Sequence, residues 1–80
     1  MTIRILGTGC AKCNTLESLV RQAITDLAMP ANIEKVKDLN QITNYGVIMT
    51  PGLVINEQVK SAGKLPSLDQ IKIWILETIG

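Results

Sequence analysis

The chain has 80 residues, of which 46% are hydrophobic, and its formal net charge is +1. This length suits one small folding unit, so we expect a single domain over residues 1–80. The eight basic and seven acidic side chains are scattered, without a run of Lys or Arg. That distribution argues against binding to nucleic acid or to an anionic membrane surface.

The N-terminus, beginning Met1-Thr2-Ile3-Arg4, lacks the charged and apolar regions of a signal peptide. No apolar run approaches the roughly 20 residues that a membrane-spanning helix needs. We therefore expect a cytoplasmic protein. In that compartment, the spacing of Cys10 and Cys13 favours metal binding or redox catalysis over a structural disulfide.

The first third of the chain predicts a strand followed by a helix. Thr2–Leu6 is mostly apolar and β-branched and ends at Gly7, which indicates a buried strand. From Cys10 onward the apolar residues recur with the period of an amphipathic helix. Pro30 cannot continue this helix, which should end by about Ala28. The apolar stripe comprises Leu16, Leu19, Val20, Ala23, Ile24 and Leu27.

The remaining two thirds predict three further strands and two helices. Asp38 and Ser67, each followed three residues later by Gln, are capping-box patterns that open helices. The expected elements are a strand over Asn32–Lys37, a helix through Asn44, strands over Gly52–Ile55 and Val59–Ala62, and a helix from Ser67 through Ile79.

The predicted order is therefore β-α-β-α-β-β-α. The first two strands need a crossover and should be parallel, while the last two are close enough to form an antiparallel hairpin. Asn56-Glu57 lies at the hairpin turn, and Glu in place of the usual Gly leaves the turn type open. Helices should cover both faces of this four-stranded mixed sheet. The last helix is apolar on more than one side, which predicts deep burial or self-association.

The segment Gly9-Cys10-Ala11-Lys12-Cys13 carries the chemistry. Residues three apart on a helix are neighbours, so the two sulfurs can bond with little backbone motion. Cys10 should lie at the helix N-terminus, where free N–H groups and the helix dipole favour a thiolate, and Lys12 adds positive charge nearby. We predict that Cys10 attacks disulfides and that the more shielded Cys13 resolves the mixed disulfide.

Two other interpretations of the cysteines stay open. Two thiolates are half of a tetrahedral zinc site, and the chain has no His and no other Cys, so structural zinc would require a dimer. A two-coordinate soft ion such as Cu(I) is the other metal alternative that the dithiol leaves open. Alternatively, the dithiol belongs to a redox-sensing interaction module without turnover. We expect neither a resident metal nor a cofactor. Gly7-Thr8-Gly9 is interpreted as a turn, because Lys12 breaks the dinucleotide-binding pattern.

The whole chain resembles the thioredoxin/glutaredoxin-like proteins, specifically the small redox-active disulfide proteins. Gly7–Cys13 follows the first strand, and Thr50-Pro51 comes about 40 residues after the cysteines, ahead of a hairpin and a helix. The resemblance implies an α/β protein with a minimal thioredoxin-like fold. It also implies a cis bond between Thr50 and Pro51, packed beside the cysteines and presenting backbone to a substrate. Tyr45-Gly46-Val47 and Ser61-Ala62-Gly63 add to the match.

The function implied is thiol–disulfide oxidoreduction with a disulfide-containing protein or small molecule as substrate and an unnamed electron donor. The chain departs from the family in several places. Its first strand has no buried carboxylate, no Trp precedes Cys10, and Ala11-Lys12 replaces the tyrosine common in glutaredoxins. The glutathione-binding pattern is not evident around Ala62-Gly63-Lys64.

The soft-metal carrier alternative rests on a looser resemblance. Gly-x-x-Cys-x-x-Cys is similar to the motif of heavy-metal-binding ferredoxin-like domains. Those domains follow the order β-α-β-β-α-β, so the order of elements and strands distinguishes the two folds.

Overall fold

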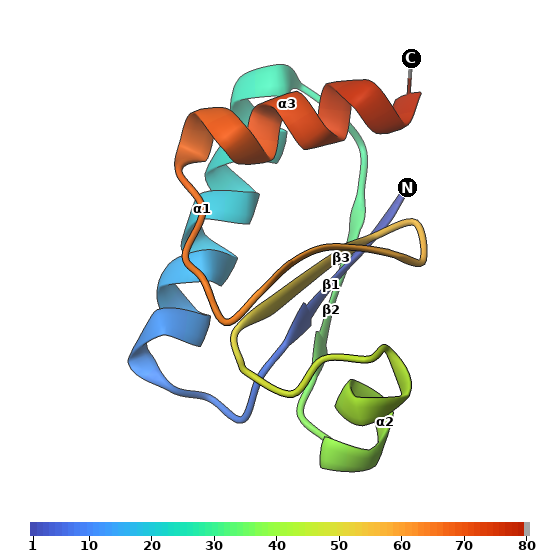
Figure 1. Cartoon of the computed structure of the whole chain (residues 1–80). Coiled ribbons are helices and arrows are strands. Elements are labelled where there is room, and N and C mark those ends of the chain that lie inside the picture. Colours follow the sequence, from blue (N-terminus) through green and yellow to red (C-terminus); the bar gives the residue numbers. More distant parts are fainter. Residues whose placement is uncertain (80) are drawn as a thin grey trace.

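A computed structural model of the chain describes residues 1–79. Its elements follow the predicted order β-α-β-α-β-β-α (Figure 1). The second strand ends one residue earlier than expected, at Val36, and the fourth begins one residue earlier, at Gln58. The elements are β1 (Thr2–Leu6), α1 (Ala11–Leu27), β2 (Asn32–Val36), α2 (Leu39–Asn44), β3 (Gly52–Ile55), β4 (Gln58–Ala62) and α3 (Leu68–Ile79).

The four strands form one mixed sheet in the order β2-β1-β3-β4. β1 and β2 are parallel, whereas β3 runs antiparallel to both β1 and β4. This is the predicted α/β arrangement of a minimal thioredoxin fold. Because a helix separates β2 from β3 and the last described element is a helix, the order of elements gives no support to the ferredoxin-like metal carrier.

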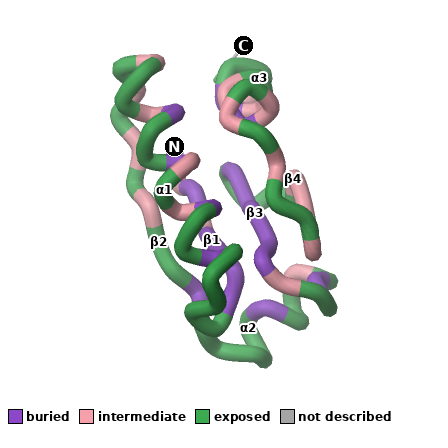
Figure 2. Tube along the Cα trace, turned by 90° about the vertical axis from the view of Figure 1, so that its left-hand side faces the viewer, coloured by how far each residue is buried: buried purple, intermediate pink, exposed green. Residues whose placement is uncertain are grey.

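Helices cover both faces of the sheet, as expected. α1 and α3 lie together on one face and α2 lies on the other (Figure 1). The alternation of side chains in β1 explains this division, since Ile3 and Ile5 join the core beneath α1 and α3 while Leu6 joins the core beside α2. The buried backbone of β1 and β3 lies between these layers (Figure 2).

Local hydrogen bonds set the ends of the helices. The Asp38 carboxylate accepts from the N–H of Asn40 at 2.8 Å, and the Ser67 hydroxyl accepts from the N–H of Gln70 at 3.1 Å. Both caps lie where the sequence predicts them. α1 ends at Leu27, and the left-handed φ of 53° at its C-cap residue, Ala28, turns the chain away before Pro30.

The hairpin between β3 and β4 turns at Asn56 and Glu57, with φ values of 47° and 69°. Both central residues are therefore left-handed, as in a type I′ turn, although neither is glycine. The Asn56 side-chain oxygen accepts from the Thr2 N–H at 2.9 Å, and the Glu57 carboxylate pairs with Arg4. These contacts connect the turn to β1.

The second apolar side of α3 is exposed, because Ile73 and Leu76 retain 51% and 47% of their accessible surface. The predicted deep burial of this side is therefore wrong, and self-association through it stays a prediction. α3 packs through its other side, where Ile71 and Ile75 are fully buried. No helix within residues 1–79 combines the length and apolarity needed to cross a membrane.

Two isoleucines of α3 provide a matched test of the core. We expect Ile75→Ala to lower the free energy of unfolding by about 2–5 kcal/mol, because it opens a cavity beneath the helix. Ile73→Ala, on the exposed side, should change it by about 0.5 kcal/mol or less. Urea denaturation followed by circular dichroism measures both, and equal losses would contradict the described packing of α3.

Candidate functional site

The pairing of β1 with β3 brings distant parts of the chain to one end of the sheet. Leu6, at the end of β1, lies opposite Gly52, at the start of β3. The residues just after β1 and just before β3 therefore meet at the same edge, and α1 begins there as well (Figure 1). The peptide bond between Thr50 and Pro51 in this region is cis.

Gly7 marks the point at which the predicted site residues come together. A Cβ atom placed on Gly7 would lie 2.3 Å from the Sγ of Cys13 and 3.9 Å from the Cβ of Thr50. Cys13 and the residue before Pro51 thus border the same glycine. Pro51 itself is buried, and its carbonyl accepts a hydrogen bond from the Gly63 N–H at 2.8 Å.

Cys10 is the exposed thiol of the pair and caps the N-terminus of α1. Its backbone is extended, with φ −70° and ψ 166°, which turns the side chain back over the first helical turn. The Sγ accepts a hydrogen bond from the backbone N–H of Cys13 at 3.3 Å. The Cys13 side chain and this N–H both stabilise the thiolate, and together they hold the pKa of Cys10 below its usual value.

Cys13 lies one turn into α1 and retains only 5% of its accessible surface. Burial is the main cause that raises the pKa of the Cys13 thiol. The hydrogen bond to Cys10 raises it further, because the proton of the Cys13 thiol is shared with the neighbouring sulfur. The two cysteines therefore differ in the way that a nucleophile and a protonated second thiol should differ.

Sequence reasoning missed the contact between Gly7 and the sulfur of Cys13. We expected Gly7 to serve a turn, but its φ lies outside the left-handed region that requires glycine. What glycine provides here is space for the sulfur. No sequence signal distinguishes these two uses, because the contact depends on how α1 packs beside the end of β1.

The loop before Pro51 carries two exposed apolar side chains, Ile48 at 90% and Met49 at 68% of their accessible surface. Met49 also packs against Gly63, where a Cβ atom would lie 2.9 Å from the Met49 Cβ. Gly63 therefore holds this loop through both a backbone hydrogen bond to Pro51 and a side-chain contact.

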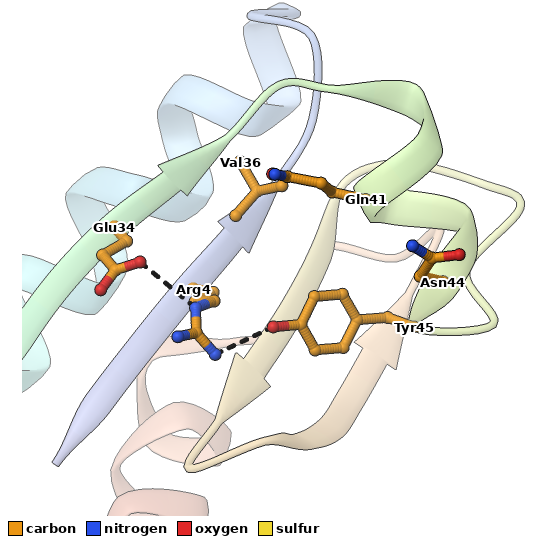
Figure 3. A pocket seen from close by; sticks show the side chains of 6 residues that line it. All are labelled: Arg4, Glu34, Val36, Gln41, Asn44 and Tyr45. Atoms are coloured by element: carbon orange, nitrogen blue, oxygen red, sulfur yellow. Dashed lines mark hydrogen bonds and ion pairs between the residues drawn. The ribbon is translucent and has the colours of Figure 1, made fainter.

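A polar pocket of about 450 Å³ lies away from the cysteines, on the α2 side of the sheet (Figure 3). The Arg4 guanidinium donates to the Tyr45 hydroxyl at 2.9 Å and pairs with Glu34 at 3.3 Å. The Arg4 side chain and these partners therefore lie on the α2 face of the sheet, and this position of the first strand provides no carboxylate near the thiols. The pocket is lined by Arg4, Glu34, Val36, Gln41, Asn44 and Tyr45.

Across the described residues, no three side chains of His, Cys, Asp or Glu gather closely enough to hold a metal ion. Cys10 and Cys13 are the two thiols of the described chain, and together they offer two sulfurs.

Comparison with known proteins agrees with the fold. The family model described as "Thioredoxin domain" matches residues 1–76. A protein named "Thioredoxin" from Methanothermobacter thermautotrophicus is 40% identical over 72 residues, which cover 90% of this chain and 94% of that protein. Another of the same name from Methanocaldococcus jannaschii is 42% identical over 72 residues, covering 90% of this chain and 83% of the relative.

The pKa shifts predict how the two thiols react with iodoacetamide. Cys10 should be alkylated first at neutral pH, and its rate should rise with pH through a midpoint below that of an ordinary thiol. Cys13→Ala removes the largest cause of the lowered pKa, so it should move that midpoint upward and slow the alkylation of Cys10 at pH 7. Mass spectrometry of quenched samples measures both rates.

Cys13→Ser is the matched control, because its hydroxyl keeps a hydrogen-bond donor at this position. It should shift the Cys10 midpoint less than Cys13→Ala does. Preferential alkylation of Cys13 in the unmodified chain would reverse the assignment of the two thiols.

Proposed function

This chain belongs to the thioredoxin family, and we propose that it is a thiol–disulfide oxidoreductase acting through Cys10 and Cys13. One observation carries the proposal: neighbouring thiols on one helical turn have opposite environments, one exposed with a lowered pKa and one buried with a raised pKa. A structural pair of cysteines has no need of this asymmetry.

In the first step, the Cys10 thiolate attacks one sulfur of a substrate disulfide. A bond forms between Cys10 and that sulfur, the substrate disulfide breaks, and the other substrate sulfur leaves as a thiolate that takes a proton from water. Exposure of Cys10 gives the substrate access to its sulfur, and the Cys13 N–H and thiol stabilise the anion before attack.

In the second step, the Cys13 thiol loses its proton to the departing thiolate or to water and attacks the Sγ of Cys10. The intramolecular disulfide forms and the second substrate thiol leaves, so two electrons pass from the dithiol to the substrate. The pKa of Cys13 falls once Cys10 is bound in the mixed disulfide, because the negative charge on the neighbouring sulfur is then gone.

Thr50 and Pro51 are proposed to bind the substrate beside the thiols. The Cys13 sulfur and the Thr50 side chain both lie within 4 Å of the place that a Cβ atom on Gly7 would occupy, which supports this role. Pro51 has no N–H and its carbonyl is already bound to Gly63, so a substrate would contact the backbone of Thr50. The substrate is a disulfide-containing protein or small molecule, and a separate electron donor regenerates the dithiol. We place this cycle in the cytoplasm, where thiols are kept reduced.

The two steps predict different outcomes for the two serine variants. Insulin reduction is measured by turbidity with dithiothreitol as the electron donor. Cys10→Ser should reduce insulin no faster than dithiothreitol alone does, because the variant lacks the attacking sulfur. Cys13→Ser should also lose turnover, and when it is incubated with insulin in the absence of dithiothreitol it should accumulate a mixed disulfide through Cys10, visible as a mass increase that later addition of dithiothreitol reverses. A Cys13→Ser protein that turns over normally would contradict the proposed resolving role.

A further inference from the structure

Gly7, which directly follows β1, lies against the sulfur atom of Cys13. A Cβ atom at this position would lie 2.3 Å from the Sγ and 3.2 Å from the Cβ of Cys13. Ordinary van der Waals contact begins at 3.4 Å, so even a methyl group would displace the sulfur by about 1 Å. Gly7 therefore defines one wall of the space that the Cys13 sulfur occupies.

Two other glycines near the site, Gly9 and Gly52, are needed for reasons that differ from those at Gly7. Gly9 has a φ of +95° with open space around it, so its backbone conformation is what favours glycine. Gly52 would place a Cβ atom 3.3 Å from carbons of Leu6 and Val47, which is a tight contact with aliphatic side chains. Gly7 alone of these three would contact a sulfur.

Neither backbone beside this contact can move easily. The Gly7 N–H donates to the Val36 carbonyl at 2.9 Å, and the strand before it is paired on both sides. On the other side of this contact, Cys13 lies in α1 three residues before Leu16, which is fully buried in the core. A larger residue at position 7 would therefore act mainly on the side chain of Cys13, by turning it toward another rotamer.

We propose that Gly7 is a positioning residue for the resolving thiol, because its missing side chain holds open the place from which the Cys13 sulfur attacks Cys10. This inference rests on the proposed function and adds a third residue to its second step. Gly7 itself touches neither the substrate nor the bond that breaks. It acts only through the sulfur of Cys13.

The predicted consequence of Gly7→Ala is selective. Displacing a reacting atom by about 1 Å costs up to about 100-fold in rate, so attack of Cys13 on the mixed disulfide should slow by about 10- to 100-fold. Attack by Cys10 on the substrate should keep its rate once Cys10 is fully ionised, because the Cys10 sulfur is exposed and lies outside the contact.

The test follows thionitrobenzoate release after the reduced protein is mixed with one equivalent of DTNB in a stopped-flow instrument. The pH is chosen on the plateau of Cys10 alkylation. The first equivalent reports attack by Cys10 and the second reports resolution by Cys13. Gly7→Ala should keep the first phase and slow the second, whereas the matched control Gly52→Ala should keep both.

Equal second phases in Gly7→Ala and the unmodified chain would overturn the inference, as would equal slowing in Gly52→Ala. Failure of the proposed function looks different. In that case the unmodified chain itself would release only one equivalent of thionitrobenzoate, and so would Gly7→Ala.

A double-mutant cycle provides a second measurement that does not depend on catalysis. Gly7→Ala should lower the midpoint of thermal unfolding by about 5 °C or more, and most of this loss should vanish in a Cys13→Ala background, where the sulfur is absent. Recovery of folding in the double variant would support the inference even where Gly7→Ala alone unfolds. An equal loss in both backgrounds would show that the sulfur is not what Gly7 accommodates.

Discussion

The antiparallel pairing of β1 with β3 is the constraint on which the site depends. Leu6 lies opposite Gly52, so the chain just after β1 must pass the chain just before β3. Because only four residues separate β1 from α1, the same pairing also places the helix N-terminus at this edge. A shift of this register by one residue would exchange the faces of β3 and separate the Thr50–Pro51 step from the thiols.

The opposite environments of the two thiols follow from one helical turn. The N–H groups of the first helical turn have no carbonyl partner within the helix, so the cap residue Cys10 meets free N–H groups and solvent. Three residues later, the same helix has turned toward the sheet, where Cys13 is buried near Leu16. The spacing of three thus produces both the short path between the sulfurs and the difference in their pKa values.

Local sequence patterns were sufficient for the elements but not for the contacts between them. The hydrophobic period of α1, the caps at Asp38 and Ser67, and the hairpin all lie within one or two residues of their predicted places. Exposure of the second side of α3 and the partners of Arg4 depend on packing between segments far apart in the chain. The space for the Cys13 sulfur at Gly7 depends on the same long-range packing. In the sequence, a glycine that permits a turn after a strand cannot be told from one that leaves room for a neighbouring side chain.

The absence of a carboxylate on the first strand changes how the second step must be driven. Where a thioredoxin-like site has no internal base, the proton of the resolving thiol must go to water or to the leaving thiolate, so the position of the sulfur matters more than its ionisation. In this chain Arg4 occupies the α2 side of β1 and is already paired with Glu34 and Glu57. In the proposed second step, geometry at Cys13 is then the main means of accelerating resolution. In the proposed mechanism, the space left open at Gly7 and the position of Cys13 in the first turn of α1 supply that geometry, while the hydrogen bonds that lower the pKa of Cys10 stabilise the attacking thiolate.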